Sequence, residues 1–203
     1  YGAIDLDESA SLFDNLANLS TCSVAEPWAD GKLPSFEDVK CWYGFMYFET
    51  QGSGFQAQEL SFDSKTLHDR VQVFIDDAQV GSAYRASCPA KVAAPAGQQM
   101  GLLVENMGRI NYGTGVVDYK GLLVPPPVKG HWTAHCLPLR PEQVRALPFA
   151  SGGRGGGPAF HRGSLHISGA PADTYLDTAG LTKGLIWVSP RSFSPLSRCS
   201  RLS

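Results

Sequence analysis

The feature that most constrains the fold of this chain is the stretch 101–124, which reads GLLVENMGRINYGTGVVDYKGLLV. Residues 102–105 alternate in the period-two pattern that turns one face of a strand toward a core. Residues 117–120 repeat this period, with Val117 and Tyr119 on the apolar side. Three prolines at 125–127 cannot donate amide hydrogens to a sheet, so the second strand ends at Val124. The stretch therefore predicts two strands joined by a polar loop.

The predicted loop is rich in residues that tolerate a positive φ angle. They are Asn106, Gly108, Asn111, Gly113 and Gly115. Such residues allow an irregular backbone at little steric cost. We expect functional side chains on this loop, because loops carried on a rigid scaffold often hold them.

Four sequence segments, in order, resemble the β-galactosidases of glycoside hydrolase family 35. The central one is LLVENMGRINYG with its following D-Y-K-G-L, and the others are YGFMYFET at 43–50, HDRVQVFIDDAQVG at 68–81 and DTYLDTAGLTKGLIWV at 173–188. The resemblance covers roughly residues 40–190 and stops at Val188. It implies the C-terminal all-β region that follows the catalytic barrel in that family. We therefore expect the barrel to be absent from this chain.

We expect an all-β fold, a jelly-roll-like (galactose-binding-domain-like) sandwich followed by an incomplete second β-sandwich. The predicted divisions are a linker strand and short helix at 1–34, the first sandwich at 35–128, a connection with a glycine-rich insertion at 129–157, a partial second sandwich at 158–188, and a divergent, disordered tail at 189–203. The tail is rich in serine and arginine, which suits disorder. A frameshifted reading frame and a natural short isoform both remain open for it.

Local patterns predict the individual elements. Short helices are expected at 12–19 and 141–147, the second with proline in its first turn, and a serine-capped turn at 35–38. Strands are expected at 42–50, 71–75, 131–135, 164–167, 174–177 and 184–188, with a surface crossing at 86–97. A hairpin turn is expected at Asp76-Asp77, although aspartate in place of glycine leaves the turn type open.

Composition excludes several classes of function. The formal net charge is −2 and the isoelectric point is near 6.2, so the chain lacks the basic character of nucleic-acid binders. No run approaches the ~18 apolar residues that would cross a bilayer, and the first residues do not resemble a signal peptide. We expect no nucleic acid, membrane span or cofactor as a partner.

The cysteines and one asparagine are relevant to the cellular compartment. The chain has five cysteines, at 22, 41, 88, 136 and 199, with no C-x-x-C pair. They are expected to be buried or free thiols, and the sequence leaves any disulfide pairing open. Asn18 begins the sequon Asn-Leu-Ser and is a glycosylation site if the chain is secreted. The resemblance implies a lysosomal, vacuolar or secreted location.

No residue is expected to be catalytic. The family's two glutamates lie on the barrel, and Glu105 is expected to form an ion pair with Arg109 or Lys120. His131 and His135 have a metal-binding spacing for a helix, but their segment is predicted as a strand, so no metal site is expected. The 151–157 glycine run lacks a phosphate-loop signature.

Tyr112 is the one candidate for a contact with substrate. A tyrosine between asparagine and glycine can present its ring to the face of a sugar, and the resemblance puts this loop near the mouth of the barrel. The alternative is packing between domains. Arg109 is expected to be structural. The predicted function is that of the non-catalytic β-domains of a β-galactosidase, which buttress the barrel and border the galactoside pocket; the alternative is a stand-alone carbohydrate-binding module.

Overall fold

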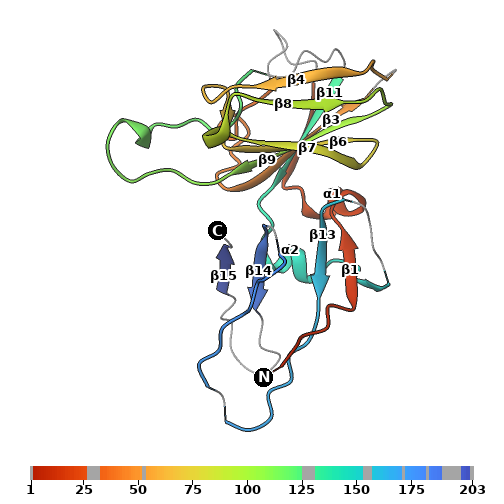
Figure 1. Ribbon diagram of the computed structural model, residues 1–203, viewed down its shortest axis with the longest axis vertical. Helices are drawn as coiled ribbons and strands as arrows, with labels where there is room; N and C mark the ends of the chain where they lie inside the picture. Colours follow the sequence, from red (N-terminus) through yellow and green to blue (C-terminus); the bar gives the residue numbers. More distant parts are fainter. Residues whose placement is uncertain are drawn as a thin grey trace.

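The computed structural model describes residues 2–26, 33–51, 54–124, 131–152, 157–170, 172–181, 183–188 and 198–201. Most of its regular structure is antiparallel β-sheet, as the sequence predicts. Figure 1 shows a large sandwich above a smaller unit, with one long loop projecting from the side of the sandwich. Within the described ranges, no helix has the length and apolar character that a membrane span requires.

The main sheet of the sandwich has six antiparallel strands in the order β2-β11-β3-β9-β6-β7. Their bounds are Cys22–Glu26 for β2, His131–Leu137 for β11, Gly44–Gln51 for β3, Met100–Asn106 for β9, Arg70–Ile75 for β6 and Ala78–Tyr84 for β7. Strand β9 pairs with β3 on one side and β6 on the other. The first part of the stretch 101–124 therefore supplies β9, a central strand of the main sheet.

Two strand pairs make the remaining sheets of the sandwich. Strand β4 (Gln58–Phe62) pairs with β8 (Ala90–Ala94), and β5 (Leu67–His68) pairs with β10 (Gly121–Leu122). One core cluster contains side chains of the main sheet, including Phe48, Val73 and Leu102, together with Leu60 and Val92 from the β4–β8 pair. The second layer of the sandwich thus covers one face of the main sheet.

The other face of the main sheet is buried as well. Tyr47, Phe74 and Leu103 point away from the first core and join a second cluster with Leu19 and Val144. Every residue of β9 is buried, so its alternating residues serve two cores and not the single core that the pattern predicts. This double burial explains the nearly continuous apolar run of β9.

The smaller unit has short elements. A three-stranded sheet contains β12 (Ala150–Ser151), β1 (Glu8–Ser11) and β13 (Ala159–Arg162), and a two-stranded sheet contains β14 (Leu185–Val188) and β15 (Arg198–Arg201). The described helices are α1 (Leu16–Leu19) and α2 (Pro141–Arg145), and the described 3₁₀ turns are η1 (Phe13–Asn15) and, in the sandwich, η3 (Arg85–Ser87) and η4 (Thr114–Val116). Trp187 packs against Phe160, with ring centroids 6.1 Å apart.

Several local predictions are confirmed. Residues 12–19 form η1 followed by α1, and α2 begins at Pro141. The Ser35 Oγ accepts a hydrogen bond from the Asp38 amide at 3.2 Å, which makes the predicted capped turn. At the β6–β7 turn, Asp76 and Asp77 both have positive φ, 48° and 65°, as a type I′ turn requires.

The predicted strand at 117–124 is wrong for most of its length. Only Gly121 and Leu122 form a strand, and residues 117–120 have no regular structure. Val117 and Tyr119 are exposed, whereas Lys120 is buried. Charged side chains occupy the interior here because they pair with one another. The apolar pattern therefore predicts the wrong residues to be buried.

Three other predicted elements differ. The 86–97 crossing contains strand β8, whose small alanines and Val92 pair with β4. Residues 164–167 and 174–177 were predicted as strands, but both segments are irregular because no described strand pairs with them. Without a partner strand, their apolar residues have no sheet to stabilise an extended conformation.

Two predicted segments lie partly outside the described residues. They are the glycine-rich insertion, of which 153–156 is not described, and the tail, of which 189–197 and 202–203 are not described. The described part of the tail forms β15, which pairs with β14. Disorder of the tail therefore stays a prediction.

Candidate functional site

The loop between β9 and β10, residues 107–120, is the candidate functional site. Residues 107–114 are all exposed, and the green loop stands out from the sandwich in Figure 1. Its first turn is fixed by Asn106, whose Oδ1 accepts the Gly108 amide hydrogen at 3.0 Å and whose Nδ2 donates to the Trp42 carbonyl at 3.2 Å. Gly108 and Gly113 have φ angles of 91° and 74°, which L side chains rarely adopt.

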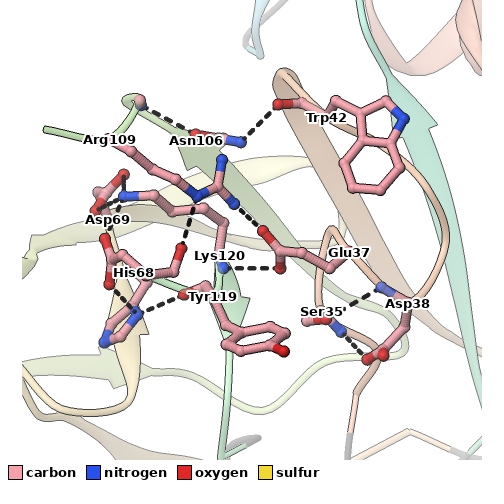
Figure 2. Close-up of polar contacts among 12 residues, drawn as sticks. Ser35, Glu37, Asp38, Trp42, His68, Asp69, Asn106, Arg109, Tyr119 and Lys120 are labelled. Carbon is pink, nitrogen blue, oxygen red and sulfur yellow. Dashed lines mark hydrogen bonds and ion pairs between the residues drawn. The ribbon is translucent and has the colours of Figure 1, made fainter. Parts of the chain in front are cut away.

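A buried ion cluster closes the base of the loop. Lys120 is 1% exposed, and its Nζ lies 2.8 Å from both carboxylate oxygens of Asp69 and 2.6 Å from Asp118 Oδ2. Arg85 Nη1 donates to Asp118 Oδ2 at 2.9 Å. Asp69 Oδ2 also accepts the Met107 amide hydrogen at 2.8 Å. Asp69 therefore holds both ends of the loop through one carboxylate, as Figure 2 shows in part.

The charges in this cluster balance, since two carboxylates face one ammonium and one guanidinium. Burial alone would raise the pKa of Asp118, but hydrogen bonds and charge from Lys120 and Arg85 outweigh burial and lower that pKa. His68 Nδ1 lies 3.1 Å from Asp118 Oδ1 and 2.5 Å from the Tyr119 carbonyl oxygen. The cluster is therefore built to keep Asp118 charged.

A second wall of the site is the segment 33–43. Glu37 pairs with Arg109, and its Oε2 accepts the Lys120 amide hydrogen at 3.0 Å (Figure 2). The Phe36 amide donates to the Lys120 carbonyl at 2.9 Å. Arg109 Nε also donates to the Asp118 carbonyl at 2.9 Å. These contacts fix the loop against a neighbouring piece of chain as well as against the sheet.

The site exposes several large apolar and aromatic side chains. The exposed large side chains here, which we call the apolar rim, are Trp42, Tyr43, Met107, Ile110, Tyr112, Val116, Val117 and Tyr119. Tyr112 is 77% exposed and lies on the part of the loop farthest in sequence from both strands, beside exposed Asn111. Its contact with a sugar stays a prediction.

The other residues singled out in the sequence have structural partners. Glu105 is buried and pairs with Lys183 at 3.1 Å and with Arg70 at 3.6 Å, not with Arg109 or Lys120. His135 bonds Ser23 and Glu49 across the sheet, at 2.9 and 3.0 Å. In the described parts of the chain, no three potential ligands gather into a metal site.

Asn18, the predicted glycosylation site, is exposed on α1. Its Nδ2 donates to Asn15 Oδ1 at 3.3 Å. An exposed asparagine at a helix surface is sterically open to modification, and its glycosylation stays a prediction.

Sequence reasoning missed most of the buried ion cluster. Asp69, Arg85 and Asp118 were not nominated, and Lys120 was considered only as a partner of Glu105. The available signal was the DYK triplet at 118–120, in which two charges share one side of a strand-like segment. Charges at alternate positions indicate either a solvated face or an internal ion pair.

The site can hold a loop rigidly and present aromatic and polar groups. The carboxylates of Asp69, Asp118 and Glu37 are each bound in ion pairs with Lys120, Arg85 or Arg109. Binding or docking is therefore the chemistry that this geometry supports.

Comparison with known proteins gives one family and several relatives. The family described as "Beta-galactosidase, first all-beta domain" matches residues 34–136. A β-galactosidase of Xanthomonas manihotis is 36% identical over 196 residues, which cover 92% of this chain and 30% of the relative. Beta-galactosidase 1 of Dictyostelium discoideum is 27% identical over 93% of this chain and 32% of its own length.

The human β-galactosidase is 32% identical over 183 residues, which cover 76% of this chain and 27% of the human protein. The chain thus spans about 30% of the length of these relatives. The matched region contains the main sheet from β3 to β11 and the whole of the loop with its ion cluster. The resemblance inferred from the sequence is confirmed, and the chain belongs to the family of β-galactosidase first all-beta domains.

Proposed function

We propose that this chain is the non-catalytic β region of a β-galactosidase, which buttresses the catalytic barrel and borders the galactoside pocket. The observation that carries the proposal is the loop 107–120, which exposes several large apolar and aromatic side chains and whose base is held by buried ion pairs. A segment that only connected two domains would not need its base fixed by buried ion pairs. A rigid, exposed loop is suited to contact a second surface.

The apolar rim supports docking against another part of the protein. Eight large apolar or aromatic side chains are exposed on two neighbouring segments, and exposed apolar surface near a site often marks an interaction. Arg109 and Glu37, which lie on the same two segments, pair with each other, so their charges balance. The barrel is the partner that membership of the family implies.

Tyr112 is the residue that we place at the edge of the galactoside pocket. An exposed aromatic ring can stack on the apolar face of a galactose ring, while Asn111 offers an amide to its hydroxyl groups. The fixed loop base reduces the entropy lost on binding. Substrate in this proposal is a terminal β-galactoside, which the barrel hydrolyses.

For the architecture, we propose a jelly-roll-like sandwich at 35–128 and a partial second sandwich at 158–188. Residues 1–34 are the linker strand and short helix that follow the barrel, and 129–157 connect the two sandwiches; these two segments also contribute β2 and β11 to the main sheet. Residues 189–203 are a divergent tail. The two-layer arrangement of the main sheet and the β4–β8 pair supports the first assignment. The short sheets of the smaller unit support the second.

A lysosomal, vacuolar or secreted location completes the proposal. Cys41 and Cys136 form a disulfide, and disulfides persist mainly in oxidising compartments. The exposed sequon at Asn18 is consistent with passage through the secretory pathway.

The pocket-edge role can be tested by measuring the kinetics of a full-length β-galactosidase that carries this segment. We expect Tyr112→Ala to lower kcat/KM by the factor that corresponds to about 1–3 kcal/mol, roughly 5- to 150-fold. Tyr175→Ala is the matched control, because Tyr175 is 92% exposed and lies in the smaller unit. Equal kcat/KM values for both variants and the parent enzyme would contradict the pocket-edge role.

The chain alone provides a second test. We expect no release of galactose from a β-galactoside, because both catalytic glutamates belong to the barrel in this family. Inhibitor-sensitive release by the purified 203-residue chain would overturn that expectation. Calorimetric titration with galactose separates the two functions: tight binding to the isolated chain would favour a stand-alone carbohydrate-binding module over a buttress that only completes a pocket.

A further inference from the structure

Three cysteines gather at one end of the main sheet. Cys41 and Cys136 form a disulfide, and Cys22 is a free thiol. Strands β2 and β11 pair in a register that sets Cys22 directly opposite Cys136. Residues directly opposite in an antiparallel pair point to the same face, so the Cys22 side chain projects toward the face that carries the disulfide. Cys22 packs against the core cluster that contains both disulfide partners.

The backbone spacing suits an alternative disulfide. Directly opposite residues of antiparallel strands have Cα atoms about 4.5–5.5 Å apart, within the range of about 4.4–6.8 Å that disulfides span. The existing disulfide has a Cα–Cα distance of 5.8 Å in the same range. Cys22 Sγ also lies 3.9 Å from the Val39 carbonyl oxygen, so the thiol sits between β11 and the segment that carries Cys41.

We propose that Cys22, Cys41 and Cys136 form an internal thiol–disulfide exchange site with two covalent states. The Cys22 thiolate attacks Cys136 Sγ, a bond forms between Cys22 and Cys136, and the Cys41–Cys136 bond breaks. Cys41 leaves as a thiolate and takes up a proton from solvent, which replaces the proton that Cys22 lost. The numbers of disulfides and thiols do not change, so the step needs no oxidant or reductant.

The exchange has a structural consequence for the loop. Cys41 lies in the segment 33–43, which contacts the loop through Glu37 and Phe36 and contacts Asn106, where the loop leaves β9, through the Trp42 carbonyl. In the Cys41–Cys136 state, this segment is covalently tied to β11, the second strand from one edge of the main sheet. In the Cys22–Cys136 state, the bond instead ties β2 to β11, and the loop loses the covalent support of its second wall. The pair of states therefore couples thiol chemistry to the rigidity of the loop.

Disulfide mapping of the full 203-residue chain tests the exchange. A Cys88→Ser/Cys199→Ser background leaves only the three cysteines of the proposed site. The protein is held folded at about pH 8.5, where thiolates form, and is then alkylated, acidified and digested for mass spectrometry. We expect a growing Cys22–Cys136 linked peptide and a matching amount of alkylated Cys41. A sample that contains only the Cys41–Cys136 link and alkylated Cys22 at every time point would overturn the proposal.

Single variants lock each state. Cys41→Ser should form a Cys22–Cys136 disulfide under mild oxidation, and Cys22→Ser should retain Cys41–Cys136. Because either variant could be impaired in folding, the mapping of the three-cysteine chain decides the proposal without them. A folded Cys41→Ser chain whose remaining two cysteines stay fully alkylatable under oxidation would also overturn it.

Trypsin cleavage after Arg109 tests the coupling to the loop. We expect cleavage roughly tenfold faster in the Cys41→Ser chain than in the Cys22→Ser chain, because local opening of the loop costs less when its wall is not cross-linked. Cleavage in the 68–81 hairpin region, after Arg70, serves as the internal reference, since β6 lies within the main sheet in both states. Equal Arg109 cleavage rates in two folded variants would refute the coupling.

Discussion

The sandwich and the smaller unit both contain segments whose apolar residues predict strands, but these segments become strands far more often in the sandwich. In the sandwich, the main sheet has six strands and apolar clusters on both faces. In the smaller unit, sheets have two or three strands, and the segment 164–181 contains exposed apolar residues such as Tyr175 and Leu176. Alternating residues become a strand only where neighbouring strands and a covering layer are available. Periodicity alone does not decide the structure.

The same contrast applies to charge. In the sandwich, Lys120 is buried among carboxylates, whereas in the smaller unit Arg162 pairs with Glu8 at the surface, 2.7 Å from Nε to Oε2. A buried pair cannot be broken without leaving an uncompensated charge, but a surface pair can be replaced by water. The ion pairs of the two regions should therefore respond very differently to mutation.

Lys120→Met should produce the largest loss of stability. The variant leaves Asp69 and Asp118 without their ammonium partner in the interior, and such losses cost about 3–5 kcal/mol. The measurement is the free energy of unfolding in urea. Arg162→Met is the matched control, with a far smaller expected effect. Similar losses in the two variants would show that Lys120 is screened by solvent after all.

Leu102→Ala should come next. Leu102 is fully buried in the first core, and truncation of such a leucine costs about 2–5 kcal/mol. Leu176→Ala makes the same chemical change at a residue that is 52% exposed in the smaller unit, so its effect should stay within about 0.5 kcal/mol. Urea midpoints for the two variants compare the regions directly. A large effect of Leu176→Ala would mean that the 164–181 segment packs more firmly than its exposure indicates.

The sequence predicted the sandwich better than the smaller unit for a physical reason. Strands such as β3, β6 and β11 have apolar residues at nearly every core position, so burial and period agree. Segments 164–167 and 174–177 were expected to be strands from their apolar residues but find no ladder partner among the described strands. Pairing over long sequence distances is not contained in a local pattern. The disulfide between Cys41 and Cys136, separated by 95 residues, is a further long-range fact of this kind.

The candidate site was predicted in outline but not in its support. The glycine and asparagine pattern indicated an irregular loop, and Gly108 and Gly113 do adopt positive φ. The pattern gave no sign that Asp69, 38 residues before Met107, binds the amide at the start of the loop. The alternation of apolar residues at 117–120 predicts Lys120 on the surface, because a pattern of polarity contains no information on which charged side chains pair with each other.

The pH dependence of the ion cluster follows from Asp118. Its pKa is lowered in the folded chain, so its stabilising effect is fully present above the pKa of an unfolded aspartate, about 3.9, and is lost as the pH falls through the folded pKa. The difference in unfolding free energy between the parent chain and Asp118→Asn should therefore be largest near neutral pH and shrink below about pH 4. Urea titrations at several pH values measure it. Asp173→Asn, at an exposed position in the smaller unit, should give a small, pH-independent difference.

The smallest effects are expected for the two exposed tyrosines, one from each region. Tyr112 is 77% and Tyr175 is 92% exposed, so replacement of either by alanine should change the stability of the chain by no more than about 0.5 kcal/mol. For a chain of this size, the melting temperature should then move by about 2 °C at most. Thermal melts of the two variants check this. If Tyr112→Ala alone melted several degrees lower, its ring would be a packing residue of the loop. A kinetic effect in the full-length enzyme would then report lost loop order, and the role of Tyr112 at the pocket edge would lose its support.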